Sequence, residues 1–261
     1  MLALAPVEIS RADRKLLAWW KLDEDSGTTA ADSSGNNCTG TLMGDPQWQP
    51  SGGKVGGALQ FDGDDYIEIA NEANFDLTAQ ITVMAWIKVS TFDKSFQSIV
   101  TKGDSAWRLQ RDGQKDNLEF ACTGVLTDNV IGKVSGKVDV NDGSWHHAAG
   151  IYDGTKLYLY VDGKLDNSGA ASGLISNNDE HVLISQNAEK TERQWNGLID
   201  DVRIYNYALS EADVAAIHAG RPPATGRQEP GRRSNWIPVL VIVIIAVVAA
   251  GIATRRKKAT T

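Results

Sequence analysis

The sequence predicts an all-β fold in which antiparallel strands pack as a sandwich, followed by a short helix and a membrane-spanning helix. Between residues 16 and 205, short runs rich in Val, Ile, Tyr and Trp alternate with period two and are separated by clusters of Gly, Asp and Asn. No long helical pattern precedes Ser210, and parallel strands would need such helices as connections. The pattern therefore favours an antiparallel sandwich or barrel.

The clearest strand pair is the hairpin at residues 146–169. Its stretch KLYLYV, residues 156–161, presents one aliphatic and one aromatic face, and Asp-Gly pairs at 153–154 and 162–163 suit the tight turns at its ends. The run ITVMAWIKVS, residues 81–90, also has two largely apolar faces, as expected of a central strand. Further strands are predicted at 16–22, 58–62, 65–69, 97–101, 106–111, 117–123, 181–186 and 197–205.

A short helix is predicted to close the domain where the period changes, in ALSEADVAAIHAG. Ser210 can cap its N-terminus with Asp213 completing a capping box, and Leu209 can pack on Val214 as a hydrophobic staple. Gly220 ends the segment.

The remaining segments predict a membrane anchor. Residues 1–15 read as an irregular lead-in, and the Pro-, Gly- and Arg-rich residues 221–235 as a linker. Residues 236–254 carry no charge and, as a helix, reach about 28 Å, close to the thickness of the hydrocarbon core. The basic residues 255–261 would form a cytoplasmic tail, which places the sandwich outside the cytoplasm. A buried core helix is the alternative for 236–254.

Charge argues against nucleic acid as a partner. Eight Lys or Arg and only Glu229 lie from Arg221 onward, so residues 1–220 have a net charge of −14 within a chain total of −7. Binding to nucleic acid depends on neutralising phosphates with basic side chains, which an acidic domain does not offer.

Five segments in order resemble one family. They are LLAWWKLDEDSGTTAADSSGNNCTGTL (16–42), GGALQFDGDDYIEI (56–69), ITVMAWIKV (81–89), DGSWHHAAGIYDGTKLYLYVDGK (142–164) and GLIDDVRIYNYALSEADV (197–214). Together they resemble the laminin G-like, concanavalin A-like domains of bacterial surface and secreted proteins. The resemblance implies a jelly-roll β-sandwich over residues 16–220. It implies less about function, since this fold is shared by lectins, glycosidases, calcium-dependent adhesins and spacers.

The resemblance also implies one structural calcium ion, because similar domains often bind it between the first strands and an acidic pair in the last strand. Carried over to this sequence, its ligands would be Asp32, Asn36, Asp62 and Asp200 or Asp201. Calcium prefers such oxygen ligands. Asp residues in turns, however, often serve only to form the turn, which is the alternative for Asp32 and Asp62.

Asp200 and Asp201 are unusual because they interrupt an apolar strand. Period two would send Asp200 to the face of Val202 and Asp201 to the face of Arg203. One carboxylate must then enter an apolar layer, where it needs a partner: a cation, backbone amides, or an ion pair such as Asp201 with Arg203. We favour Asp200 as the inward residue.

Catalysis is not predicted. Glycosidases of the resembled superfamily carry Glu-x-Asp-x-x-Glu on one strand, and this spacing does not occur here. Adjacent acids such as Asp200 and Asp201 should face opposite sides of a sheet. None of the four histidines accompanies a Ser or Cys nucleophile motif.

Among the eight tryptophans, Trp107, with Arg108 beside it, is the candidate for an exposed sugar contact. Packing in the core is its alternative. We therefore expect a cell-surface, membrane-anchored module that binds a glycan or a protein, is stabilised by calcium and is not an enzyme. A hydrolase with atypical residues and a passive spacer of the cell envelope are the competing hypotheses.

Overall fold

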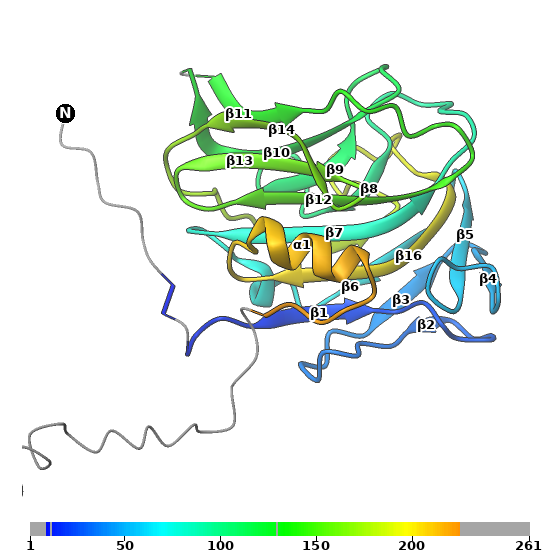
Figure 1. The fold of residues 1–261 in the computed structure, drawn as a ribbon. Coiled ribbons are helices and arrows are strands. Elements are labelled where there is room, and N and C mark those ends of the chain that lie inside the picture. Colours follow the sequence, from blue (N-terminus) through cyan, green and yellow to red (C-terminus); the bar gives the residue numbers. More distant parts are fainter. Residues whose placement is uncertain (1–8, 11, 129, 225–261) are drawn as a thin grey trace, which may run out of the picture. The chain divides into compact units, whose positions relative to one another are not determined.

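A computed structural model describes residues 9–10, 12–128 and 130–224, and its regular structure consists almost entirely of antiparallel strands in two layers (Figure 1). The first sheet runs in the order β14-β13-β12-β7-β16-β5-β4, with β1 also paired to β16. Its strands are β14 (Lys164–Ala170), β13 (Lys156–Val161), β12 (Trp145–Tyr152), β7 (Ile81–Lys88), β16 (Asn196–Tyr205), β5 (Ala58–Asp62), β4 (Gln47–Gln49) and β1 (Leu16–Trp20).

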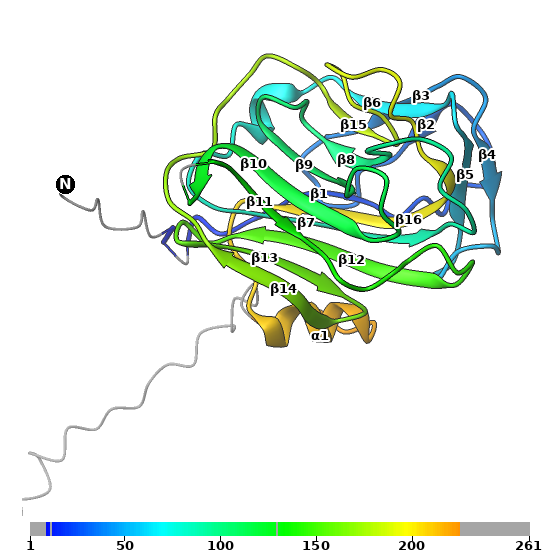
Figure 2. The ribbon, with the colours of Figure 1, turned by 90° about the horizontal axis from the view of Figure 1, so that it is seen from above.

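The second sheet runs in the order β11-β10-β9-β8-β15-β6-β3-β2 and lies over the first (Figure 2). Its strands are β11 (Val130–Ser135), β10 (Leu118–Thr127), β9 (Trp107–Arg111), β8 (Ser98–Thr101), β15 (Val182–Ile184), β6 (Tyr66–Ile69), β3 (Gly40–Met43) and β2 (Thr29–Ala30). A short 3-10 helix, η1 (Glu72–Phe75), follows β6.

The predicted sandwich is confirmed, and every predicted strand run contains a strand. The hairpin of β12 and β13 pairs Ala148 with Val161 through to Tyr152 with Leu157. The short strands β2, β3 and β4, and the edge strand β11, were not predicted individually. Few apolar side chains repeat in such short runs, so period two gives little signal there.

The core lies between the two sheets, where their apolar faces meet. Gly150 of β12 lies so close to β10 that a Cβ atom on it would be 2.2 Å from Phe120 Cδ2. The sandwich is therefore packed to contact at this point. Cys38 and Cys122 are buried in the same core as free thiols, and burial raises the pKa of each.

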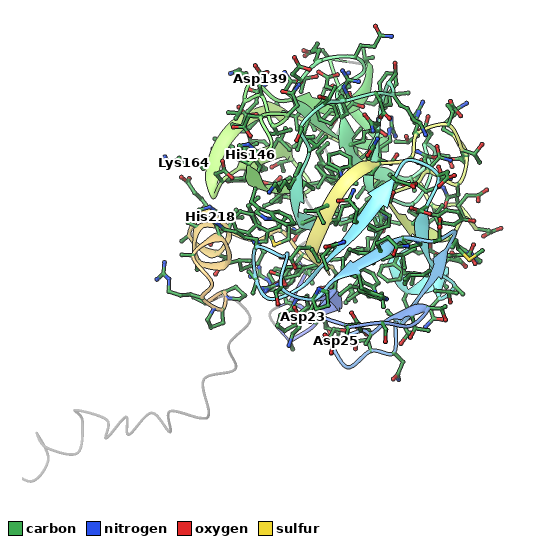
Figure 3. The ribbon with its side chains drawn as sticks, turned by 90° about the vertical axis from the view of Figure 1, so that its right-hand side faces the viewer. Asp23, Asp25, Asp139, His146, Lys164 and His218 are labelled. Atoms are coloured by element: carbon green, nitrogen blue, oxygen red, sulfur yellow. The ribbon has the colours of Figure 1, made fainter. Side chains whose placement is uncertain are left out.

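The predicted closing helix is α1 (Glu211–His218), and it lies on the outer face of the first sheet (Figure 2). Ser210 and Asp213 form the predicted capping box. The helix buries a second apolar cluster, made by Met84, Ala149, Ile151, Tyr160, Tyr205, Tyr207, Leu209, Val214 and Ile217. At its end His218 stacks on Trp86 with ring centroids 5.2 Å apart, beside the turn that precedes Lys164 (Figure 3).

No helix among the described residues is long and apolar enough to cross a membrane. The predicted membrane span at 236–254, the basic tail at 255–261 and most of the linker lie outside the described residues, so these segments stay predictions.

Candidate functional site

Trp107 is not an exposed contact, and that prediction is wrong. Its side chain is fully buried in the core, where Nε1 donates to the backbone carbonyl of Phe75 at 3.3 Å. Arg108 faces the other side of β9 but is also largely buried. Its Nη1 donates to the carbonyl of Asp104 at 2.8 Å and to Thr123 Oγ1 at 3.2 Å. Strand β9 is buried on both faces, which period two alone does not reveal.

Asp32 organises the loop after β2. Its two carboxylate oxygens accept from the backbone N–H groups of Trp19, Ser34 and Cys38 at 2.8–3.1 Å, and from Ser34 Oγ at 2.8 Å. Burial alone would raise the pKa of Asp32, but the hydrogen bonds from Cys38 and Ser34 outweigh it and lower the pKa. Asn36 donates its side-chain amide to backbone carbonyls of β1. The loop is thus held by protein groups.

A β-bulge in β16 changes the faces predicted for the acidic pair. Asp200 pairs with Trp86 of β7 and Arg203 with Met84, so two residues of β16 oppose one residue of β7 between these pairs. Asp201 takes a left-handed backbone conformation, with φ of 49°. Asp200 therefore shares the outer face of the first sheet with Trp86, instead of the inner face with Val202.

Both carboxylates lie toward this outer face, so the prediction that they point to opposite faces is wrong. Asp201 forms an ion pair with Arg203 at 2.9 Å and accepts a hydrogen bond from Trp19 Nε1. Trp19 belongs to β1, where it lies opposite Arg203 of β16. The predicted pairing of Asp201 with Arg203 is confirmed. Asp200 is fully buried, and its Oδ2 accepts from the backbone N–H groups of Lys54 and Val55, each at 2.8 Å.

Asp200 is held in an environment that disfavours its charge. Its other oxygen, Oδ1, is buried without a hydrogen-bond partner among the described residues. Burial raises the pKa of Asp200 to about 7, and the nearby charges of Asp201 and Asp23 act in the same direction. The amides of Val55 and Lys54 only partly offset these effects.

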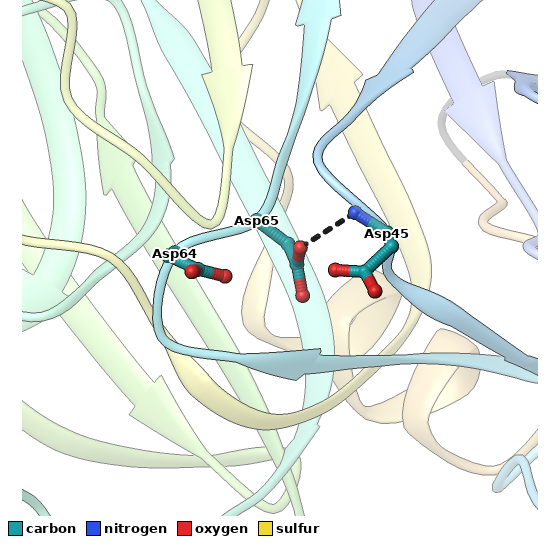
Figure 4. Close-up of side chains that lie close together, drawn as sticks. All are labelled: Asp45, Asp64 and Asp65. Carbon is teal, nitrogen blue, oxygen red and sulfur yellow. Dashed lines mark hydrogen bonds between the residues drawn. The ribbon is translucent and has the colours of Figure 1, made fainter.

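No three of the predicted carboxylate ligands Asp32, Asp62, Asp200 and Asp201 form a cluster with oxygens within 4.8 Å of one another in the described part of the chain. Within the described residues, the cluster of carboxylates whose oxygens lie within 4.8 Å of one another is Asp45, Asp64 and Asp65 (Figure 4). None of these three was among the predicted ligands, although the neighbouring Asp62 was. In the sequence, DGDD at residues 62–65 indicates only a turn. Asp45 comes from the loop between β3 and β4, which reaches this turn only in the folded chain.

The acidic cluster of Asp45, Asp64 and Asp65 lies beside Asp62 at the turn between β5 and β6. Asp65 is buried and accepts from the backbone N–H of Asp45 at 2.9 Å and of Asp62 at 3.3 Å. Burial raises the pKa of Asp65, and a contact with Asp62 raises that of Asp64. Hard oxygen ligands gathered in this way suit Ca²⁺.

The outer face of the second sheet carries a row of mostly polar side chains that are built into strands. Across neighbouring strands the register aligns Lys133, Ala121, Arg108, Thr101, Leu183 and Glu68 in one row. Residues opposite one another in a sheet share a face, and the alternate residues of these strands belong to the core. This row therefore points away from the sandwich interior.

At the β11 end of this face the charges neutralise one another. Lys133 Nζ lies 2.8 Å from Glu119 Oε2 and 3.3 Å from Asp112 Oδ1, and Gln110 donates to Glu119 Oε1 at 2.7 Å. Burial raises the pKa of Glu119, while hydrogen bonds from Lys115 and other neighbours outweigh burial and lower that of Asp112. Both carboxylates are buried and occupied, as expected of a structural cluster.

At the β6 end the same face opens into a pocket with a volume of about 270 Å³. It lies where β6 and β15 pair, Leu183 opposite Glu68, and a loop after β15 completes it. It is lined by Tyr66, Glu68, Asp179, Glu180, His181, Leu183, Gln186, Ala188 and Thr191. Most of these side chains can form hydrogen bonds, and Tyr66 adds an aromatic ring.

Gln186 lines the pocket with its side-chain amide. It is only 5% exposed, and its Oε1 accepts from the backbone N–H of Asn187 at 3.3 Å. Its Nε2 donates to no group in the described part of the chain. Because Gln186 Nε2 is not among the buried atoms that lack a partner, its N–H groups are open to the pocket, where a ligand can accept from them.

The two antiparallel sheets form a β-sandwich, an arrangement consistent with a jelly roll, and the polar pocket lies on one of its outer faces. The chain belongs to the Laminin_G_3 family, described as the concanavalin A-like lectin/glucanases superfamily, whose family model matches residues 61–215. No match was found among curated protein sequences.

Solved structures with the same fold include carbohydrate- and receptor-binding domains. Domain 4 of AbnA, a GH43 extracellular arabinanase from Geobacillus stearothermophilus, in complex with arabinotriose, aligns with a TM-score of 0.61 and 21% identity over 77% of this chain and 97% of that domain. The binding domain of botulinum neurotoxin DC aligns in complex with SialylT (TM-score 0.58, 16% identity, 81% of this chain) and with rat synaptotagmin II (0.60, 17%, 80%). The chain spans 52% of each toxin structure.

Proposed function

We propose that this chain is a glycan-binding module, not an enzyme, and that the pocket lined by Tyr66 and Gln186 on the second sheet is its binding site. The observation that carries the proposal is that the side-chain N–H groups of Gln186 have no acceptor in the described part of the chain and line a polar pocket. Sugars present hydroxyl groups for such donors and C–H faces for an aromatic ring. The structural neighbours that bind carbohydrate support the same class of function.

Display outside the cytoplasm on a membrane anchor is part of this proposal. It is supported by the uncharged run 236–254 and the basic tail that follows it. Fractionation of cells with protease added outside would test it. Digestion of the sandwich in intact cells is the expected result, and protection of the sandwich would contradict the orientation.

Glycan binding is tested with the full chain in detergent on an array of oligosaccharides, followed by calorimetric titration of the best ligand. Tyr66→Ala and Gln186→Ala should each weaken binding about fivefold, since each removes one contact of about 1 kcal/mol. Tyr158→Ala is the matched control, because Tyr158 is a half-buried tyrosine of the first sheet. Unchanged affinity in both pocket variants, or no saturable binding to any glycan, would refute the proposed site.

Catalysis is tested separately. Incubation with the polysaccharides that bind should release no reducing ends above the buffer control. If the repurified protein still releases reducing ends, and a pocket variant does not, the chain is a hydrolase instead of a binding module.

Calcium binding at Asp45, Asp64 and Asp65 is the second part of the proposal. The ion would supply positive charge among three carboxylates whose oxygens lie within 4.8 Å of one another, next to Asp62, which raises the pKa of Asp64. Asp32, Asn36, Asp62, Asp200 and Asp201 are not its ligands in this proposal; Asp32, Asn36 and Asp201 form hydrogen bonds with other protein groups, and Asp200 does so through Oδ2. Calcium at about 100-fold above its Kd should add about 2.7 kcal/mol of stability. A melting temperature that is identical in calcium and in chelator would refute it.

A protein ligand is the second candidate, favoured by exposed apolar side chains around the tip of the β10–β11 hairpin. Leu126, Val130 and Ile131 are 45%, 65% and 51% exposed. Exposed apolar patches mark interaction surfaces. A receptor that binds the wild-type chain should bind Val130→Ser with Ile131→Ser less tightly, whereas the Tyr66→Ala variant should bind it normally.

A further inference from the structure

The electrostatics of the pocket restrict the class of glycan it accepts. Three of its lining residues, Glu68, Asp179 and Glu180, are acidic, and no Lys or Arg lines it. The only basic lining group, His181, lies with Nδ1 at 3.2 Å from Glu68 Oε1. A positive charge on the imidazole would therefore be paired with Glu68, which leaves the negative charges of Asp179 and Glu180.

Two of the cations near the pocket, Lys102 and Arg193, are paired with other groups, and Lys190 stands in the pocket loop next to Glu189 and close in sequence to Glu192. Lys102 holds the base of the loop that carries Asp179, and its Nζ lies 2.8 Å from Glu72 Oε2 and 3.0 Å from Asp76 Oδ1. Arg193, in the loop after β15, pairs with Asp104 at 2.7 Å. These charges are balanced locally and do not neutralise the pocket.

The pocket also lacks the geometry of a metal centre. No three carboxylate or imidazole ligand atoms of its lining residues lie within 4.8 Å of one another in the described part of the chain. The acidic groups are spread around a cavity of about 270 Å³, which is room for a sugar ring and its substituents. The negative charge is therefore spread over a surface that suits a ligand larger than a single metal ion.

We propose that the pocket binds amino sugars, that is, oligosaccharides whose rings carry a protonated amine, and rejects uronic and sialic acids. The amine would lie near Asp179 and Glu180, while Gln186 donates to a ring hydroxyl and Tyr66 supports the ring. This inference rests on the proposed glycan site. Charge pairing of this kind gives specificity more than affinity, because like charges are excluded.

Calorimetric titration of the full chain at pH 6 with two pentasaccharides tests the proposal: the deacetylated chitosan pentamer and the neutral, N-acetylated chitin pentamer. The two share one backbone and differ in charge. We expect on the order of tenfold tighter binding of the chitosan pentamer at low salt, and a smaller preference at 0.5 M salt. An oligogalacturonate of similar length should not bind.

Asp179→Asn with Glu180→Gln should abolish the preference while the chitin pentamer binds as before. Asp25→Asn with Asp139→Asn removes the same charge from exposed positions outside the pocket lining (Figure 3) and should keep the preference. Melting curves establish that both variants are folded. The salt dependence of the preference is measured on the wild type, so this part of the test does not depend on whether a variant folds.

The outcomes separate the two claims. Equal binding of both pentamers, a preference that survives the pocket variant, or binding of neutral glycans alone would overturn the amino-sugar inference and leave the glycan site standing. No binding of any glycan would overturn both. Tighter binding of lysine-rich peptides than of the chitosan pentamer would overturn the assignment to sugars.

Discussion

Replacing Asp200 by asparagine should change how the stability of the domain depends on pH. In an unfolded chain this carboxyl loses its proton near its usual pKa of 3.8, whereas burial raises its pKa in the folded domain to about 7. Between these values the unfolded state releases a proton that the folded state retains. The contribution of Asp200 to stability is therefore fully present below about pH 4 and is lost as the pH rises to about 7.

The size of this effect follows from the two pKa values. A difference of about 3 units corresponds to about 4 kcal/mol, at 1.36 kcal/mol per unit. Asparagine has the same shape, does not titrate, and its oxygen can still accept from the N–H groups of Lys54 and Val55. Its amide nitrogen would occupy the position of Oδ1, which has no partner there, at a cost of about 1–3 kcal/mol.

The variant should thus be about 1–3 kcal/mol less stable than the wild type at pH 4 and more stable by a similar amount at pH 8. Urea unfolding of both proteins at half-unit steps of pH, followed by tryptophan fluorescence, gives the difference in unfolding free energy. Subtracting the two curves removes the other titrating groups. A difference that stays constant from pH 4 to pH 8 would show that Asp200 is ionised normally and would refute the reasoning.

Three further predictions concern the core, the helix cap and a buried histidine. Gly150→Ala forces a Cβ against Phe120 and should cost about 1–3 kcal/mol in urea unfolding, whereas Gly169→Ala, with no atom within 4 Å, should change stability by about 0.5 kcal/mol at most. Ser210→Ala removes the capping box and should cost about 1 kcal/mol; an unchanged midpoint would contradict its role. Burial, together with the charges of neighbouring basic groups, lowers the pKa of His147 to about 3, so its imidazole should stay neutral in nitrogen-detected NMR spectra at pH 4.5, and stability should fall as the pH drops from about 6.5 toward 3. A midpoint for His147 near 6.5 would contradict this.

The parts of the fold that the sequence predicted are those governed by local rules. The β12–β13 hairpin follows from period two and an Asp-Gly turn, and the cap of α1 from Ser210 and Asp213. The bulge at Asp201 was not predictable, because its left-handed backbone depends on how β16 meets β7 and β1. Trp107 was misjudged because the layers that bury β9 come from distant parts of the chain.

The candidate site was largely missed because it is assembled by tertiary structure. Tyr66 and Glu68 come from one strand, and Asp179 to Thr191 from another segment, joined only when β6 pairs with β15. One signal was available: in the run YIEI, Tyr66 and Glu68 alternate with the core residues Ile67 and Ile69, which places both on an outer face. The acidic cluster of Asp45 with Asp64 depends in the same way on a loop approach that period and composition do not encode.

The most direct test of the central claim is to map where a glycan contacts the protein. Amide and side-chain NMR shifts of the labelled chain, recorded while the tightest glycan ligand is added, should change at Tyr66, His181 and Gln186 and stay constant on the outer face of the first sheet, for example at Tyr160. Shifts confined to the first sheet, or saturable binding that leaves the pocket residues unchanged, would contradict the assignment of the second-sheet pocket as the binding site.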